Sequence, residues 1–521
     1  MARSSDASLR RWLEDLEADA RHRPARYRAR LAGLAAIGYL YPSVVVGGTT
    51  LALALLVWFL PMTFAAEGPL VLVWLACACA AAWATWSVAQ VFHSTIAEPR
   101  GVKLEPDAGA ALRKLVEEVR HALGGVAVDE LRVDMSFNAS VAQYPALGLL
   151  GGVRNVLTLG LPLLAVHGPD ELADVLAHEF GHLAGQHGRV DRWVYRLHHT
   201  WRALRQRESG DRSLSWWLLG WFLDRYPDHL AAVTLAWRRK HEYEADRAAA
   251  ELRGASFART LMRNALWADH LERTFWEEQV REAFRDAVPP ADILERLRGF
   301  AAGPVPAPEA ARWAARQIRL GTNIHADHPC LRERLGAMGA GDLLASDVDE
   351  ARRAAPAPSA LDLLIDAPHA LDRAVRIWKA DAAPAWRSRH VWLKQARAGL
   401  DQPRTGANET PADRAWRACE IALADLAGAE ERAALEAFLT AHPAHARASF
   451  RLGLHLLDRD EDAGIAHLEA GMAKACDLVL PGLDRLLGFH RSRGEDDAGD
   501  VVRARVEKVL ADGGPRRQVA V

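Results

Sequence analysis

The 521-residue sequence predicts a mainly α-helical chain that also contains a small β-sheet. Three observations lead to this fold class. Two long uncharged runs lie near the N-terminus, amphipathic and β-type segments alternate in the middle, and small and apolar residues recur at helical spacing in the C-terminal third. The length suggests two to four domains, and a composition that is half apolar and a quarter charged is typical of a folded protein.

The expected parts follow the chain in order. They are a basic N-terminal segment (1–32), a transmembrane helical hairpin (33–92), a central α+β domain (100–343), a linker with accessory helices (344–410), a helical region (411–511) and a tail (512–521). Net charge is −2 and the basic residues are spread along helices, so we expect no nucleic acid partner. The five cysteines lack paired spacing, which argues against a disulfide scaffold.

The hairpin is predicted from length and charge. No charged side chain occurs in residues 31–66 or 69–92. Spans at about 41–60 and 69–92 meet the roughly 20 residues that a membrane crossing needs. Arginines precede the first span, Arg100 and Lys103 follow the second, and the turn between the spans carries no basic residue. The positive-inside rule then predicts a multi-pass protein of the cytoplasmic (inner) membrane with its central domain facing the cytoplasm. The alternative is a buried soluble hairpin.

The central domain begins with an amphipathic helix near 106–123, and β-type segments follow around 126–135 and 153–159. A further helix begins after Gly168-Pro169-Asp170-Glu171, because proline suits the first helical turn and acidic residues complement a helix N-terminus.

That helix carries an HExxH motif, His178-Glu179-Phe180-Gly181-His182. Histidines four residues apart lie on one helix face and can bind one metal ion, while Glu179 can hold an activated water. A third histidine would be needed at position 188 for the metzincin pattern, but that residue is glycine and His187 comes one position early. We therefore reject the metzincin pattern and expect His187 at the surface or at a helix end.

A glutamate on a second helix is the remaining route to three ligands. The stretch HEYEADRAAAEL supplies one beside small residues that let two helices approach closely, and Glu242 is our choice. Its neighbour Asp246 lies on the same face, where it can orient a ligating histidine. His241, Glu244 and Asp246 stay open as alternative ligands.

At this point the chain resembles the membrane zinc metallopeptidases of the CAAX prenyl protease and HtpX heat-shock peptidase type. Besides HEFGH, the resemblance rests on Glu242-Tyr243 with Ala245-Asp246, Asn138-Ala139, the run Leu157–Leu164, and His328-Pro329 with Arg334. It covers roughly residues 100–340 and implies a zincin-like domain of the gluzincin type with Glu242 as third zinc ligand.

The same resemblance implies that Asn138 and Ala139 form an edge strand that pairs with extended substrate. It makes His328 and Arg334 candidates for stabilising the oxyanion. Without the resemblance, His328-Pro329 is equally well explained as a turn before a helix. The apolar stretch 214–223 is too short to span a membrane, so it is either an interfacial helix or core packing.

The C-terminal third follows a proline-rich hinge at 355–358. From about 411 to 511, small and apolar residues recur near the 34-residue spacing of tetratricopeptide helix pairs, although the full signature is absent. We expect either repeat-like helical hairpins or an ordinary helical domain, and in both cases a surface for protein partners.

Together these features predict a membrane-anchored zinc metalloendopeptidase that binds one Zn²⁺ per chain. A zinc-activated water would attack the peptide bond with Glu179 as general base. The expected partners are polypeptide substrates, membrane or misfolded proteins among them, and the lipid bilayer. Two alternatives stay open: an inactive or latent membrane scaffold or chaperone with a zinc site, and a processing enzyme of the prenyl-protease type.

Overall fold

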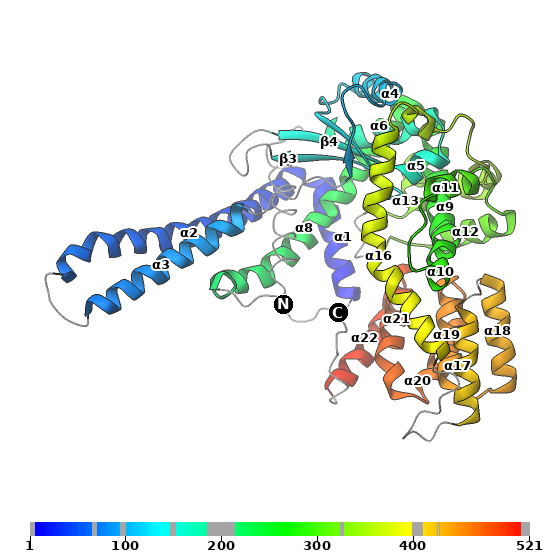
Figure 1. The fold of residues 1–521 in the computed structure, drawn as a ribbon. Coiled ribbons are helices and arrows are strands. Elements are labelled where there is room, and N and C mark those ends of the chain that lie inside the picture. Colours follow the sequence, from blue (N-terminus) through cyan, green and yellow to red (C-terminus); the bar gives the residue numbers. More distant parts are fainter. Residues whose placement is uncertain are drawn as a thin grey trace.

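The computed structural model is mainly helical and contains one four-stranded sheet, as predicted (Figure 1). It describes residues 6–64, 70–93, 101–145, 153–184, 214–322, 328–398, 410–424, 426 and 428–511. The predicted position of His187 and the tail lie outside these residues.

Three helices form the N-terminal part: α1 (Asp6–His22), α2 (Pro24–Phe64) and α3 (Leu70–His93). α2 and α3 lie side by side and project away from the rest of the chain (Figure 1), and the indole nitrogen of Trp74 donates to the carbonyl of Leu56 at 2.8 Å. Among the described residues, one helix, α2 over 24–59, is long and apolar enough to cross a membrane. The apolar part of α3, Leu72–Trp83, is shorter, so a second span stays a prediction.

The sheet has the strand order β1-β2-β4-β3. Its strands are β1 (Val102–Lys103), β2 (Glu130–Asp134), β3 (Ala139–Pro145) and β4 (Val153–Gly160). β2 and β4 are parallel, while β1 and β3 run antiparallel to their neighbours. β3 therefore stands at an edge. The strand segments predicted around 126–135 and 153–159 correspond to β2 and β4.

The central part contains further helices, of which α6 contacts β3, α16 contacts β1 and β2, and α5 contacts β4. They are α4 (Ala110–Ala122), α5 (Leu161–Val166), α6 (Pro169–Ala184), α8 (Leu214–Arg253), α9 (Ala255–His270), the π-helix η2 (Leu271–Trp276), α10 (Glu277–Arg285), α11 (Ile293–Ala301), α12 (Ala307–Arg319), α13 (Leu331–Ala337), α14 (Leu343–Ser346), α15 (Val348–Ala351), the 3₁₀ helix η3 (Ala360–Leu364) and α16 (Pro368–Ala398). One apolar core runs from Val102 to Val375.

A second, smaller core joins α1, the first part of α2 and α8. Its buried side chains include Tyr27 and Leu31 from α2 and Leu230 and Val233 from α8. The apolar stretch 214–223 forms the first turns of α8, and the side chains of Trp216, Trp217 and Trp221 lie outside the described residues.

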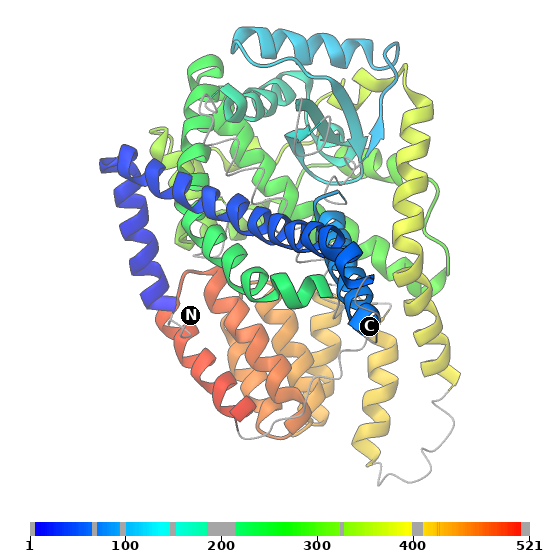
Figure 2. The ribbon, with the colours of Figure 1, turned by 90° about the vertical axis from the view of Figure 1, so that its left-hand side faces the viewer.

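The C-terminal part is helical and stacks beside the central part, below it in Figure 2. Its helices are α17 (Pro411–Leu423), α18 (Gly428–Ala441), α19 (Ala446–Asp458), α20 (Ala463–Met472), the 3₁₀ helix η4 (Cys476–Leu478), α21 (Val479–Ser492) and α22 (Asp496–Ala511). α19 and α20 are in close contact at two glycines. A β-carbon on Gly453 would lie only 2.9 Å from the carbonyl oxygen of Gly464. α22 also contacts α1.

Candidate metal centre

The helix α6 presents the HExxH motif on one of its faces. Its opposite face is buried in the main core through Leu172, Leu176 and Phe180, which fixes the helix in rotation. Asp170 and Glu171 occupy the first turn, as predicted, where carboxylates complement the helix dipole. His178 and His182 stand one turn apart, and their Nε2 atoms lie 3.1 Å from each other.

The helix α8 crosses α6 and brings Glu242 to the two histidines. Glu242 is 5% exposed. Its Oε1 lies 3.4 Å from Nε2 of His182 and its Oε2 lies 3.7 Å from Nε2 of His178. Potential ligand atoms of all three residues fall within 4.8 Å of one another.

These three side chains fit a zinc ion. Two imidazole nitrogens and one carboxylate are the protein ligands that catalytic zinc sites use when they keep an open position. Two ring nitrogens that face each other at 3.1 Å beside a buried carboxylate also form a favourable place for a cation. Burial and the neighbouring charge of His178 lower the pKa of His182 to about 3, which favours the neutral imidazole that a metal requires.

A second layer of polar groups lies behind the ligands. Nδ1 of His178 is 3.0 Å from Oδ1 of Asp246, which is 1% exposed. Arg334 on α13 donates from Nε to one oxygen of Asp246 at 2.8 Å and from Nη2 to the other at 2.6 Å. Burial of Asp246 acts against ionisation, but the bonds from Arg334 and His178 dominate and hold its pKa far below the usual range. His178 therefore has an ionised partner on its outer nitrogen.

His328 lies on the open side of the cluster. Its side chain is 67% exposed, and its Nδ1 lies 3.0 Å from Oε2 of Glu242. Arg334 is more enclosed, with Nη2 at 3.8 Å from the same oxygen. Burial of Glu242 works in the opposite direction, but the His328 hydrogen bond and the two histidine charges lower its pKa to about 2.

Glu179 separates the histidine pair from the edge of the sheet. The backbone N–H of Val141 on β3 donates to Oε2 of Glu179 at a long 3.4 Å. Burial is the main reason that the pKa of Glu179 rises to about 7. Asn138 directly precedes β3, and its carbonyl accepts from the backbone N–H of Gly160 at 2.8 Å; Ala139 is the first residue of β3 and pairs with Leu159.

Of the three alternative ligands, Asp246 contacts the outer nitrogen of His178, whereas His241 and Glu244 contact other groups. His241 Nδ1 is 3.5 Å from Glu244 Oε2, and the His241 ring contacts Trp237. Glu244 also lies 3.5 Å from the amine of Lys240. The structure thus brings together His178, His182 and Glu242.

The sequence analysis missed one network beneath the site. Asp174, one helical turn before His178 and 1% exposed, accepts hydrogen bonds from Arg253 at 2.6 Å, Ser256 at 2.6 Å and Thr260 at 2.7 Å. These partners come from the end of α8 and from α9, so the network fixes α6 to both helices. The available signal was a carboxylate at position 174 with apolar neighbours on both sides, Leu172-Ala173 and Val175-Leu176.

Residues 52–340, more than half of the chain, match the model of peptidase family M48. The fold and the site thus belong to a metallopeptidase family, and this chain is a member of peptidase family M48. No curated protein and no solved structure matches the chain. Zinc dependence is typical of this family, and the cluster of His178, His182 and Glu242 lies within the matched residues.

Proposed function

We propose that this protein is a zinc endopeptidase anchored in the cytoplasmic membrane, where it cleaves membrane or misfolded polypeptides on the cytoplasmic side. One observation carries the proposal. Ligand atoms of His178, His182 and Glu242 converge within 4.8 Å, and Glu179 lies between this cluster and the edge strand β3. Membership of a metallopeptidase family agrees with that arrangement.

Glu179 is suited to move protons. His178, His182 and Glu242 would hold the zinc ion, which would supply Lewis acidity to acidify a water and polarise a carbonyl. A carboxylate with a pKa of about 7 accepts the proton of the attacking water and then returns it to the leaving amine. The buried position that raises this pKa also keeps the carboxylate beside the reacting atoms.

The polypeptide substrate would bind along the edge strand β3. An extended peptide that pairs with the side of β3 facing away from β4 would gain backbone hydrogen bonds that depend little on its sequence. Asn138 and Ala139 would contact the peptide near the cluster. The exposed His328 would donate to the oxyanion, whereas Arg334 already binds Asp246 with two nitrogens and so acts mainly by orienting the ligands.

The membrane anchor is supported by α2, which is long and apolar enough to span a bilayer, and by the arginines that precede its apolar part. The antiparallel packing of α3 on α2 fits a two-span hairpin. Close helix packing at Gly453 and Gly464 fits tetratricopeptide-like hairpins in the C-terminal region, which we assign to protein partners. The sequence resemblance to prenyl proteases and HtpX-type peptidases fits both features.

The test compares wild-type protein with Glu179→Gln in detergent. We expect about one zinc per chain in both proteins, and a loss of about 10²–10⁴-fold in cleavage of unfolded polypeptides by the variant. Glu251→Gln, an exposed glutamate on α8, is the matched control and should cleave normally. Zinc without cleavage in the wild type would favour the scaffold alternative. Cleavage restricted to one C-terminal motif would favour the prenyl-protease alternative.

A further inference from the structure

The helix α8 connects the metal centre with the membrane-facing part of the chain. It is continuous from Leu214 to Arg253 and carries the ligand Glu242 in its second half. α8 contacts α1, α2 and α3 (Figures 1 and 2), and Phe222, Tyr226 and Val233 of its first half meet α2. The position of Glu242 relative to the bilayer therefore depends on where α2 enters the membrane.

α8 and α2 run antiparallel where they meet. Two hydrogen bonds and one ring stack mark this register, namely Tyr27 Oη to Val233 O at 2.6 Å, Tyr226 Oη to Leu34 O at 2.8 Å, and Tyr41 against Phe222 with ring centroids 4.3 Å apart. Position 222 on α8 is thus level with position 41 on α2. The ion pair between Glu17 of α1 and Arg239, at 2.9 Å, continues the contact toward the metal centre.

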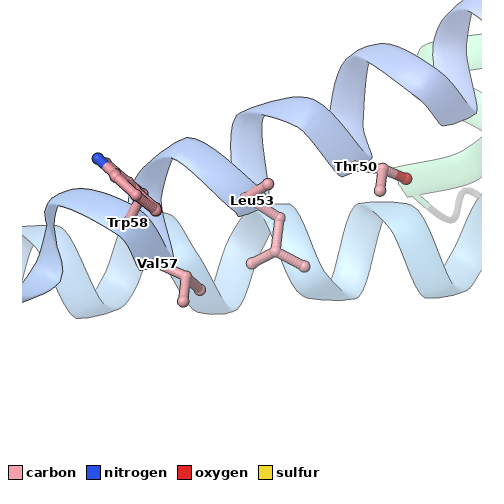
Figure 3. Close-up of a pocket in the computed structure, with 5 residues that line it drawn as sticks. Thr50, Leu53, Val57 and Trp58 are labelled. Carbon is pink, nitrogen blue, oxygen red and sulfur yellow. The ribbon is translucent and has the colours of Figure 1, made fainter.

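Near the level of Tyr41, the side chains of α2 change from buried to exposed. Tyr27, Leu31 and Ala35 are buried by protein, whereas Leu40 is 63% exposed and Trp58 is 77% exposed. An open apolar hollow lies on this exposed part, lined by Thr50, Leu53, Ala54, Val57 and Trp58 (Figure 3). The stretch 41–60 is about 30 Å long, which matches the hydrocarbon core. The membrane surface therefore lies near Tyr41 and Phe222.

From these contacts we propose that α8 is a spacer that holds the metal centre above the bilayer, so that membrane-anchored polypeptides are cleaved only beyond a minimum distance from their span. This inference rests on the proposed peptidase function. The path along α8 from Phe222 to Glu242 is 20 residues, or about 30 Å, and it sets the upper limit of the height. Along α2, the distance from Tyr41 to Tyr27 is about 21 Å, and Tyr27 is level with Val233 of α8. This distance sets the lower limit of the height of the metal centre above the membrane.

These limits define which peptide bonds of a membrane-anchored substrate can reach the metal centre. An extended chain covers about 3.3 Å per residue, so the first cleavable bond should lie between about six and about nine residues from the end of a substrate's span. Bonds nearer the membrane cannot reach the edge strand β3, because the protein-covered part of α2 and α8 stands between them. Longer tails can reach the site without being fully extended, so the cleavage rate should not decline sharply beyond about ten residues.

The experiment uses the full-length protein with zinc in lipid vesicles, together with single-span model polypeptides. Each carries the same cleavable segment after a spacer of about 3, about 6, about 10 or about 20 residues. The same segment as a free peptide serves as the control, and Glu179→Gln protein shows which cleavage belongs to this site. We expect cleavage to be at least tenfold slower with the shortest spacer than with the two longest.

Each outcome has a defined meaning. Equal cleavage at every spacer would overturn the inference, because the site would then lie at the membrane surface. Cleavage that begins only with the longest spacer would overturn the inference as well, because the metal centre would then lie farther from the membrane than α8 permits. Cleavage of the free peptide in both of these cases would leave the proposed function intact. Absence of cleavage of both tails and free peptide would reject the proposed function and the inference with it.

Discussion

Gly181 on α6 lies against Ala245 on α8 with no room for a side chain between them. A β-carbon on Gly181 would come within 3.0 Å of both the Cα and the carbonyl oxygen of Ala245. Gly181 precedes His182, and Ala245 follows Glu242 by three residues. This close approach of two backbones is what places a carboxylate from one helix beside two imidazoles from another.

Gly181→Ala should therefore force the two helices apart. We expect a loss of about 1–3 kcal/mol in unfolding free energy, together with weaker zinc binding, measured by thermal unfolding and zinc titration. Gly299→Ala is the matched control, because no atom lies within 4 Å of the added methyl group in α11. That control should be neutral or up to about 1 kcal/mol more stable. Similar behaviour of the two variants would refute the close-packing explanation.

Asp246→Asn tests the outer partner of His178. The amide cannot supply the negative charge that lies 3.0 Å from Nδ1 of His178, so we expect zinc affinity to fall about 10–100-fold with the fold retained. Competition with a zinc chelator measures this change. Glu251→Gln removes a carboxylate from the exposed face of the same helix and should leave the affinity unaltered. An unchanged affinity for Asp246→Asn would mean that this carboxylate does not orient the histidine.

Arg334→Met separates orientation from catalysis. The substitution leaves the buried Asp246 without its bidentate partner, which should cost about 3 kcal/mol in stability and also weaken zinc binding. Arg332→Met, at an exposed position two residues earlier, should change stability by less than about 0.5 kcal/mol. A direct oxyanion role predicts the opposite pattern for Arg334→Met, in which stability and zinc affinity hold while the turnover number falls.

The C-terminal region should lose stability in acid through Glu431. Burial favours its protonation, but the bond to His455 at 3.1 Å and the charge of Arg451 dominate and lower its pKa below 4.5. A carboxylate with a lowered folded pKa stabilises the fold above the unfolded pKa, and this contribution disappears as pH falls through the folded value. Hydrogen exchange of α18 and α19 should show faster opening below about pH 4.5.

Glu431→Gln provides the comparison. This variant should already open faster near neutral pH, by about 1–2 kcal/mol, and the difference from wild type should shrink as the pH falls below about 4.5. A difference that stays constant across this range would show that ionisation of Glu431 does not stabilise the two helices.

Much of the local structure could be predicted because it depends on short-range patterns. The uncharged runs, the helix that starts at Pro169, and strands β2 and β4 are each visible in periodicity, length and capping residues. The extent of the core was not visible in this way. The composition changes near residue 343, but residues up to Val375 pack with the central region, because burial depends on contacts between distant segments.

The sequence by itself determined that His178 and His182 share one helix face with Glu179 beside them, because a spacing of four residues fixes that relation within any helix. Tertiary structure decided which group on the second helix joins them. Glu242 and Asp246 share one face of α8, His241 and Glu244 lie on others, and the packing of Gly181 against Ala245 selects the face that meets α6. The edge position of β3 and the register of α8 on α2 likewise follow from pairings between distant segments, which local periodicity does not encode.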